Sequence, residues 1–225
     1  MKEKARVEVY RFDPESDKEP RYETHEIDMK EGMTVIDALL EIKKRDPSFH
    51  FNYVCRSGQC GICGVNVNGK AVLACREKAY PDMKIKPFSS FPVKKDLIVN
   101  FDDYESRLSD LRVYLDRASE PTEEPEGLDM TDIENFKKAS RCISCFCCVE
   151  SCPAFEDKPH EFDGPAALIL EARHYFDPRD DLNRDLIIKE SGLDLCIDCG
   201  KCDDACPMLE PYEIIKSLKE EILDG

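Results

Sequence analysis

The sequence predicts an α+β protein in which a mixed N-terminal domain precedes an α-helical C-terminal domain. Before residue 103, apolar and polar residues alternate in short runs, which is typical of half-buried strands. After that point the apolar residues recur at a spacing near 3.6, as they do in amphipathic helices. Thirteen cysteines lie in spaced runs in both halves of the chain. We therefore expect one domain over residues 1–103 and a second over residues 104–225.

The N-terminal elements can be placed from local pattern and turn chemistry. Residues 6–10 and 22–27 alternate as two strands, and Thr34 is a typical N-cap for the helix that follows. Asn68-Gly69 stands between two alternating runs within residues 64–73, which is a strong signal for a two-residue β-hairpin turn. Two strands, one helix and a hairpin make a small mixed domain.

The C-terminal half is punctuated by one acidic segment. Residues 120–127 are rich in glutamate and proline and are typical of a solvated connector. The residues that carry the helical spacing are Leu108, Leu111, Leu115, Ile133, Phe136, Ala139, Leu168, Ala172 and Tyr175.

Charge and composition exclude several classes of function. The chain has 32 Lys and Arg against 48 Asp and Glu, a net charge of −16 without clustered basic residues, so we expect no nucleic-acid partner. The longest apolar stretch, residues 166–170, is far shorter than the roughly 20 residues that cross a bilayer. The opening residues lack the apolar core of a signal peptide, which favours a cytoplasmic protein with reduced thiols. Regularly spaced thiols in such a compartment more often bind metal than one another.

The first cysteine group has the C-x4-C-x2-C…C spacing of plant-type [2Fe–2S] ferredoxins. Three thiolates on one short loop need tight turns, and we expect the interleaved Gly58, Gly61 and Gly64 to supply positive φ angles. Arg56 and Arg76 follow two of the ligands and would offset cluster charge. A structural zinc ion is the alternative, although zinc loops usually pair two C-x2-C elements. The predicted [2Fe–2S] ligands are Cys55, Cys60, Cys63 and Cys75.

The C-terminal half contains an internal repeat of C-x2-C-x2-C-x3-C-P, offset by 54 residues. This is the bacterial ferredoxin run, whose fourth cysteine ligates the other cluster when two runs are present. One [4Fe–4S] cluster is therefore expected on Cys142, Cys145, Cys148 and Cys206. The second is expected on Cys152, Cys196, Cys199 and Cys202. Cys147 remains, either as a buried thiol beside a cluster or as an alternative ligand.

The whole chain resembles the iron–sulfur subunit of succinate dehydrogenase and fumarate reductase. The resemblance rests on the first cysteine loop, on Asn68-Gly69-Lys70, on Leu73-Ala74-Cys75, and on Pro125-Glu126-Gly127 in the connector. It also includes Gly164-Pro165-Ala166-Ala167 and Asp177-Pro178-Arg179-Asp180 between the two runs. The family implies a β-grasp ferredoxin domain, a helical bacterial-ferredoxin-like domain and three clusters in a line. It also implies a non-catalytic electron-transfer subunit that works with an FAD-containing flavoprotein subunit.

Two departures from the family bear on the second partner. Quinone-linked members usually lack a cysteine at the position of Cys199, which leaves a [3Fe–4S] cluster, whereas this chain would hold [4Fe–4S]. The chain has no tryptophan, Phe155-Glu156 stands where many members place a quinone-pocket Trp pair, and Ile197 replaces a common histidine. Such members resemble enzymes with a heterodisulfide-reductase-like subunit in place of a quinone-binding membrane anchor. Attachment through a partner would place the chain at the inner face of the cell membrane.

Two other functions fit the cysteine spacing. One is an independent ferredoxin-like carrier that would serve several oxidoreductases as a monomer. The other is a cluster-based redox sensor, although sensing does not need three clusters in series. The residues do not indicate whether succinate is oxidised or fumarate reduced.

Overall fold

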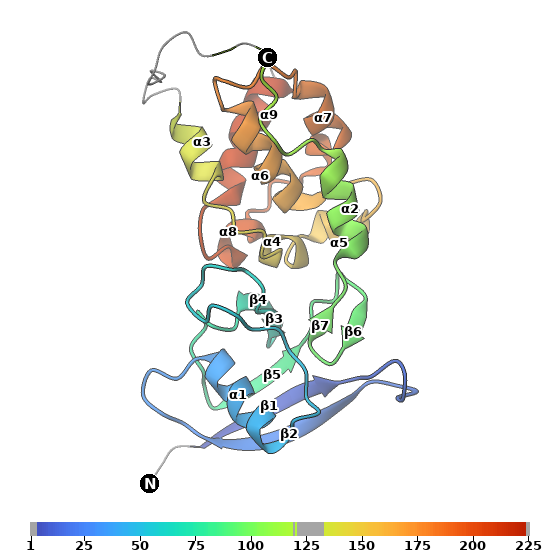
Figure 1. Cartoon of the computed structure of the whole chain (residues 1–225), viewed down its shortest axis with the longest axis vertical. Helices are drawn as coiled ribbons and strands as arrows, with labels where there is room; N and C mark the ends of the chain where they lie inside the picture. Colours follow the sequence, from blue (N-terminus) through green and yellow to red (C-terminus); the bar gives the residue numbers. More distant parts are fainter. Residues whose placement is uncertain (1–3, 119, 121–132, 224–225) are drawn as a thin grey trace. The chain divides into compact units, whose positions relative to one another are not determined.

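The computed structural model describes residues 4–118, 120 and 133–223, and the chain divides into two compact units. The first comprises Met1–Phe101 together with Ile143–Ser151, and the second comprises Asp102–Cys142 together with Cys152–Gly225. A sheet dominates the first unit and helices the second (Figure 1), which confirms the predicted α+β class. The predicted connector, 120–127, lies outside the described residues except for Glu120. The sequence predicts one boundary, after residue 103; the first unit ends at Phe101 and also includes residues 143–151.

The first unit is built on a five-stranded sheet of order β2-β1-β5-β3-β4. The β1–β5 pair is parallel and the other three pairs are antiparallel, an arrangement that matches the β-grasp expectation. Both predicted strands form, and β2 is an edge strand whose Ile27 alone is buried. The strands are β1 (Lys4–Arg11), β2 (Arg21–Asp28), β3 (Gly64–Val67), β4 (Lys70–Leu73) and β5 (Asp82–Lys86), with a separate hairpin of β6 (Val93–Lys95) and β7 (Ile98–Val99).

Helix α1 (Val35–Arg45) begins where the sequence predicts. Thr34 has extended backbone, and its backbone N–H and its hydroxyl both donate to Asp37 Oδ2, at 3.0 and 2.7 Å. Such a contact satisfies groups that the first helical turn leaves without partners. The apolar face of α1 is buried, with Leu39 and Ile42 fully inaccessible. The predicted hairpin also forms, since Asn68 and Gly69 both have positive φ angles.

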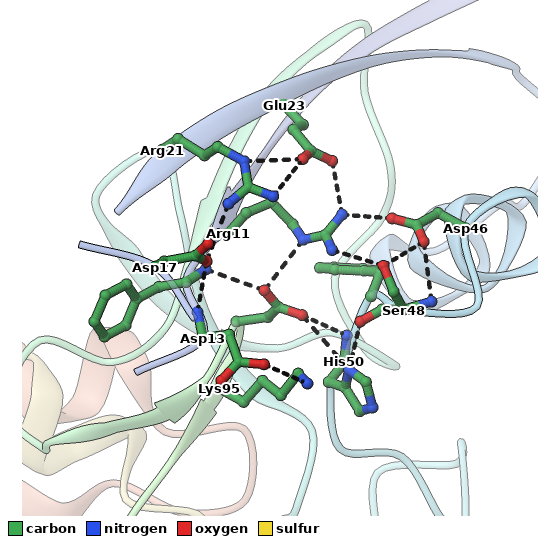
Figure 2. Close-up of polar contacts among 12 residues, drawn as sticks. Arg11, Asp13, Asp17, Arg21, Glu23, Asp46, Ser48, His50 and Lys95 are labelled. Carbon is green, nitrogen blue, oxygen red and sulfur yellow. Dashed lines mark hydrogen bonds and ion pairs between the residues drawn. The ribbon is translucent and has the colours of Figure 1, made fainter. Parts of the chain in front are cut away.

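A buried arginine joins the strands of the first unit to its loops (Figure 2). The Arg11 guanidinium donates to Glu23 Oε2 of β2 at 2.7 Å, to Ser48 Oγ at 3.0 Å and to Asp96 Oδ1 of the β6–β7 hairpin at 3.1 Å, and it also contacts Asp46. Hydrogen bonds from Ser48 and then from Arg11 lower the pKa of Asp46 to about 2. The sheet, the end of α1 and the hairpin are thereby tied together.

The second unit packs around helix α6 (Gly164–Tyr175), which is buried along most of its length. α6 contacts both α3 (Glu134–Ala139) and α9 (Pro211–Ile222). The fully buried Arg184 donates to Glu171 Oε2 at 3.0 Å and to Asp180 Oδ2 at 2.7 Å, which places the turn before α7. The other helices of this unit are α2 (Asp102–Asp110), α5 (Pro153–Asp157), α7 (Asp185–Glu190), the 3-10 turn η1 (Leu193–Leu195) and α8 (Lys201–Ala205).

No described helix has both the length and the apolar character needed to span a membrane.

Candidate iron–sulfur sites

The four N-terminal cysteines lie on two segments of the first unit. The loop that connects α1 to β3 carries three of them, and Cys75 follows β4, so the hairpin returns it to the loop. Backbone N–H groups of Ser57 and Gln59 each donate to Cys55 Sγ at 3.4 Å. These two bonds, followed by one with the Cys60 thiol, lower the pKa of Cys55 to about 6. The loop is therefore arranged to hold a thiolate at this position.

The other two thiols of this group are buried together. Cys63 is 4% exposed and Cys75 is 8% exposed, and their side chains hydrogen-bond. Burial and the neighbouring Cys75 and Cys60 raise the pKa of Cys63 to about 12. A thiol of this kind gives up its proton when a cation takes its place, which is the chemistry of a coordinating cysteine. Pairwise contacts thus link the four thiols, Cys55 with Cys60 and Cys63 with both Cys60 and Cys75, and thiols are suited to a group held by thiolates.

The glycines of this loop meet the expectation in part. Gly58 and Gly61 have φ angles of 75° and 72°. Gly64 is not among the residues with positive φ, so the expectation was wrong there; it begins β3, and a Cβ would lie 2.6 Å from the Phe88 ring. Its missing side chain makes room for an aromatic ring. A Cβ on Gly58 would lie 2.6 Å from Cδ of Arg76, which places that arginine against the loop.

The second unit brings Cys152 to the second cysteine run. Burial raises the pKa of Cys152, and the Cys199 and Cys196 thiols act on it in the same direction. Burial also raises the pKa of Cys202 to about 12, with Cys196 and Cys152 contributing. Cys152, which comes from the first run, thus lies near thiols of the second run. The ligand roles themselves stay a prediction.

The loop of the second run is held by a lysine that the spacing of cysteines does not reveal. Lys219 of α9 donates to the carbonyl of Cys196 at 2.7 Å and to both carboxylate oxygens of Asp198 at 2.8 Å. Asp198 has a φ angle of 57°, in the left-handed region that aspartate adopts more readily than most residues. The only signal in the sequence is a lysine on the polar side of an amphipathic helix, which is ordinary.

The remaining predicted quartet is divided between the compact units. Cys145 and Cys148 belong to the first unit, and Cys142 and Cys206 to the second, so their grouping stays a prediction. Cys147 is fully buried, as its packing interpretation predicts, and its hydrogen bond to Cys145 lowers the pKa of Cys145 to about 7.

The internal repeat is also a repeat of backbone shape. Ser144 and Phe146 have φ angles of 51° and 59°, and the residues 54 positions later, Asp198 and Gly200, have 57° and 69°. α4 (Cys147–Glu150) and α8 follow at equivalent positions. Two similar chain paths with identical cysteine spacing fit two similar cofactors.

Among the described residues, no three His, Cys, Asp or Glu side chains are arranged to hold a single metal ion. The fit of iron–sulfur clusters therefore rests on the contacts among the thiols and on the chain's relatives.

Comparison with known families gives two domain matches. Residues 6–106 match a 2Fe-2S iron-sulfur cluster binding domain, and residues 138–209 match a 4Fe-4S dicluster domain. Together they fit one [2Fe–2S] cluster and two clusters of the [4Fe–4S] or [3Fe–4S] type.

Individual relatives cover nearly the whole chain. The fumarate reductase iron-sulfur subunit of Mycobacterium tuberculosis is 32% identical over 230 residues, which are 97% of this chain and 93% of that protein. A subunit of the fumarate reductase (CoM/CoB) of Methanothermobacter marburgensis is 38% identical over 216 residues, 95% of this chain. The chain spans only 43% of that relative's length.

A solved structure has the same fold. A chain of the Mycobacterium smegmatis Sdh1 complex in the apo form superposes with a TM-score of 0.88 and 21% identity, covering 100% of this chain and 97% of that one.

Proposed function

This chain belongs to the family of succinate dehydrogenase and fumarate reductase iron–sulfur subunits, and from that premise we propose that it carries electrons between an FAD-containing flavoprotein subunit and a second partner. The observation that supports this most directly is the gathering of thiols in both units, one group around the N-terminal loop and one around the second run. Iron–sulfur clusters, when bound, take up and release single electrons. The chain itself supplies the thiolates and fixes the distances between the segments that carry them.

The ligands we propose are those that the spacing predicts. Cys55, Cys60, Cys63 and Cys75 would hold the [2Fe–2S] cluster. Cys142, Cys145, Cys148 and Cys206 would hold one [4Fe–4S] cluster, and Cys152, Cys196, Cys199 and Cys202 the other.

For the second partner, we favour a thiol-linked, heterodisulfide-reductase-like subunit over a quinone-binding membrane anchor. Phe155, at the position of the family's quinone-pocket Trp pair, is 4% exposed and packs edge-to-face on Tyr104, with ring centroids 5.8 Å apart. It therefore belongs to the core of its unit. Cys199 is present and exposed, and one relative bears the name fumarate reductase (CoM/CoB). The chain would be found in the cell wherever the partner subunit to which it is attached is located.

Iron and acid-labile sulfide analysis of the anaerobically purified protein tests the proposal. Three clusters of these types contain about ten iron atoms per chain. Co-purification with a flavoprotein is also expected. A protein that contained zinc and no sulfide would refute electron transfer, and a monomer that reduced unrelated oxidoreductases would support the independent carrier.

A further inference from the structure

The carboxylate of Glu150 joins helix α4 to other parts of the first unit. Glu150 Oε1 accepts hydrogen bonds from Ser89 Oγ at 2.9 Å and from Asn66 Nδ2 at 3.3 Å, and Oε2 accepts one from the Ser90 backbone N–H at 2.9 Å. Asn66 belongs to β3 and is 6% exposed, while Ser89 and Ser90 follow β5. Glu150 thus joins the segment that carries Cys145 and Cys148 to two separate parts of the sheet region.

The same segment touches the N-terminal cysteine loop at a glycine. A Cβ built on Gly61 would lie 2.7 Å from the carbonyl oxygen of Ile143 and 3.1 Å from Cβ of Cys145. Gly61 stands between Cys60 and Cys63, so a ligand-bearing loop and a ligand-bearing segment are in backbone contact. Phe146 adds apolar contacts, with its ring centroid 5.1 Å from that of Phe101 and 6.2 Å from that of Phe91.

The carboxylate of Glu150 is well placed to hold the N-terminal cysteine loop and the Cys145–Cys148 segment at a fixed distance from each other. Three donors converge on it from different directions, and hydrogen bonds to an ionised acceptor are stronger than neutral ones. Electron transfer between neighbouring cofactors becomes steeply slower with distance, so small displacements of one segment would matter. Precise geometry at a functional site commonly requires residues that are not ligands themselves but hold the ligand-bearing segments in place.

We propose that Glu150 is a positioning residue that sets the spacing between the [2Fe–2S] loop and the Cys145–Cys148 segment. This inference rests on the proposed function, because spacing matters only if both segments hold clusters. The [2Fe–2S] loop and the Cys145–Cys148 segment both belong to the first compact unit.

The test compares Glu150→Ala and Glu150→Gln with wild type, using the cluster-loaded protein reduced under anaerobic conditions. Glutamine keeps one acceptor oxygen but places an NH2 group against a donor, so it retains part of the network. Glu15→Ala is the matched control, because it removes the same charge from an exposed turn of the same unit. The readouts are EPR spin–spin interaction between the two reduced clusters and amide hydrogen exchange over residues 147–151.

We expect the interaction signal to be lost or broadened in Glu150→Ala, to be intermediate in Glu150→Gln and to be unchanged in Glu15→Ala, with iron content equal in all four proteins. Amides of residues 147–151 should exchange about tenfold faster in Glu150→Ala. If Glu150→Ala does not fold, Ser89→Ala removes one donor and should give a smaller change of the same sign.

Two results would overturn the inference, and they can be told apart. A lower melting temperature with an unchanged interaction signal would show that Glu150 has a structural role alone. A wild type without any cluster signal would overturn the proposed function and this inference with it.

Discussion

The two cysteine runs, 142–153 and 196–207, share spacing and backbone shape but differ in their surroundings. Cys147 and Phe146 of the first run are buried, whereas their counterparts Lys201 and Gly200 are exposed and half-buried. Ile197 of the second run is 60% exposed, and its counterpart Ile143 is half-buried. The first run is held by the carboxylate of Glu150 and the second by the ammonium of Lys219.

Under the proposed function, this difference suits the first run to an internal position in the electron path and the second to a terminal one. The first run contributes contacts to a compact unit and keeps its apolar side chains there. The second run leaves Ile197 and Cys199 accessible, as the proposed exchange of electrons with a partner would require. Four variants would break or sharpen the comparison, and they follow here from the largest expected effect to the smallest.

Cys199→Ser should have the largest effect, because it removes one proposed thiolate from the exposed run. We expect iron to fall from about ten to about nine atoms per chain and a [3Fe–4S] EPR signal to appear under oxidising conditions. The same change in the first run, Cys145→Ser, is the comparison. A [3Fe–4S] signal already present in the anaerobic wild type would contradict the [4Fe–4S] assignment.

Lys219→Ala should loosen the second run alone. It removes hydrogen bonds to the Cys196 carbonyl and to Asp198, which we expect to cost about 1–2 kcal/mol in the free energy of unfolding. Cluster loss under mild chelation, followed by absorbance, should become faster. Lys216→Ala on the same helix is the matched control, since its ammonium lies 4.0 Å from Glu220 and is 53% exposed. Equal cluster loss in both variants would contradict an anchoring role for Lys219.

Cys147→Ala distinguishes the two interpretations of the thirteenth cysteine. If this thiol only packs, iron content stays at the wild-type value and the free energy of unfolding falls by about 1 kcal/mol. If it is a ligand, iron is lost. The equivalent Lys201→Ala in the second run should change stability by less than about 0.5 kcal/mol, because that side chain is exposed. Urea unfolding together with iron analysis measures both.

The smallest effect is expected from Asp46→Asn in the first unit, which also contains residues 143–151 of the first run. The pKa of Asp46 is lowered to about 2 from its ordinary 3.8, so its ionised form stabilises the folded state above pH 4. That contribution is lost as the pH falls from about 4 towards 2. In Asp46→Asn this part of the pH dependence should disappear, a change of at most about 1 kcal/mol after solvent screening. Urea unfolding between pH 5 and pH 3 checks it, and parallel curves for the two proteins would contradict it.

Elements with strong local signals were predictable from the sequence. The N-cap at Thr34, the Asn68-Gly69 turn and the alternation in residues 6–10 all act over a few residues, and each is found where expected. β5 was not predicted, although Met83 and Ile85 alternate with polar residues. Its place beside β1 depends on a parallel pairing between segments more than 70 positions apart, for which no local pattern exists.

The candidate sites likewise combine features that local sequence pattern predicts with features that depend on tertiary contacts. The spacing of the two ferredoxin runs predicts that Cys152 groups with the second run, and the structure has Cys152 near Cys196 and Cys199. The residues that hold the ligand segments could not be predicted. Glu150 meets Asn66 across 84 positions and Lys219 meets Cys196 across 23, and each looks like an ordinary charged residue on a helix. Their importance comes from tertiary contacts alone.

The membership of residues 143–151 in the first unit has a consequence for biosynthesis. A ribosome that has completed Phe101 must add about 50 more residues before Glu150 exists, which takes several seconds at roughly 5–20 residues per second. During that interval the nascent N-terminal sheet has no α4 against it, and Gly61 has no contact with Ile143 or Cys145. The cysteine loop is therefore open on that side until residues 143–151 have been translated and can pack against it.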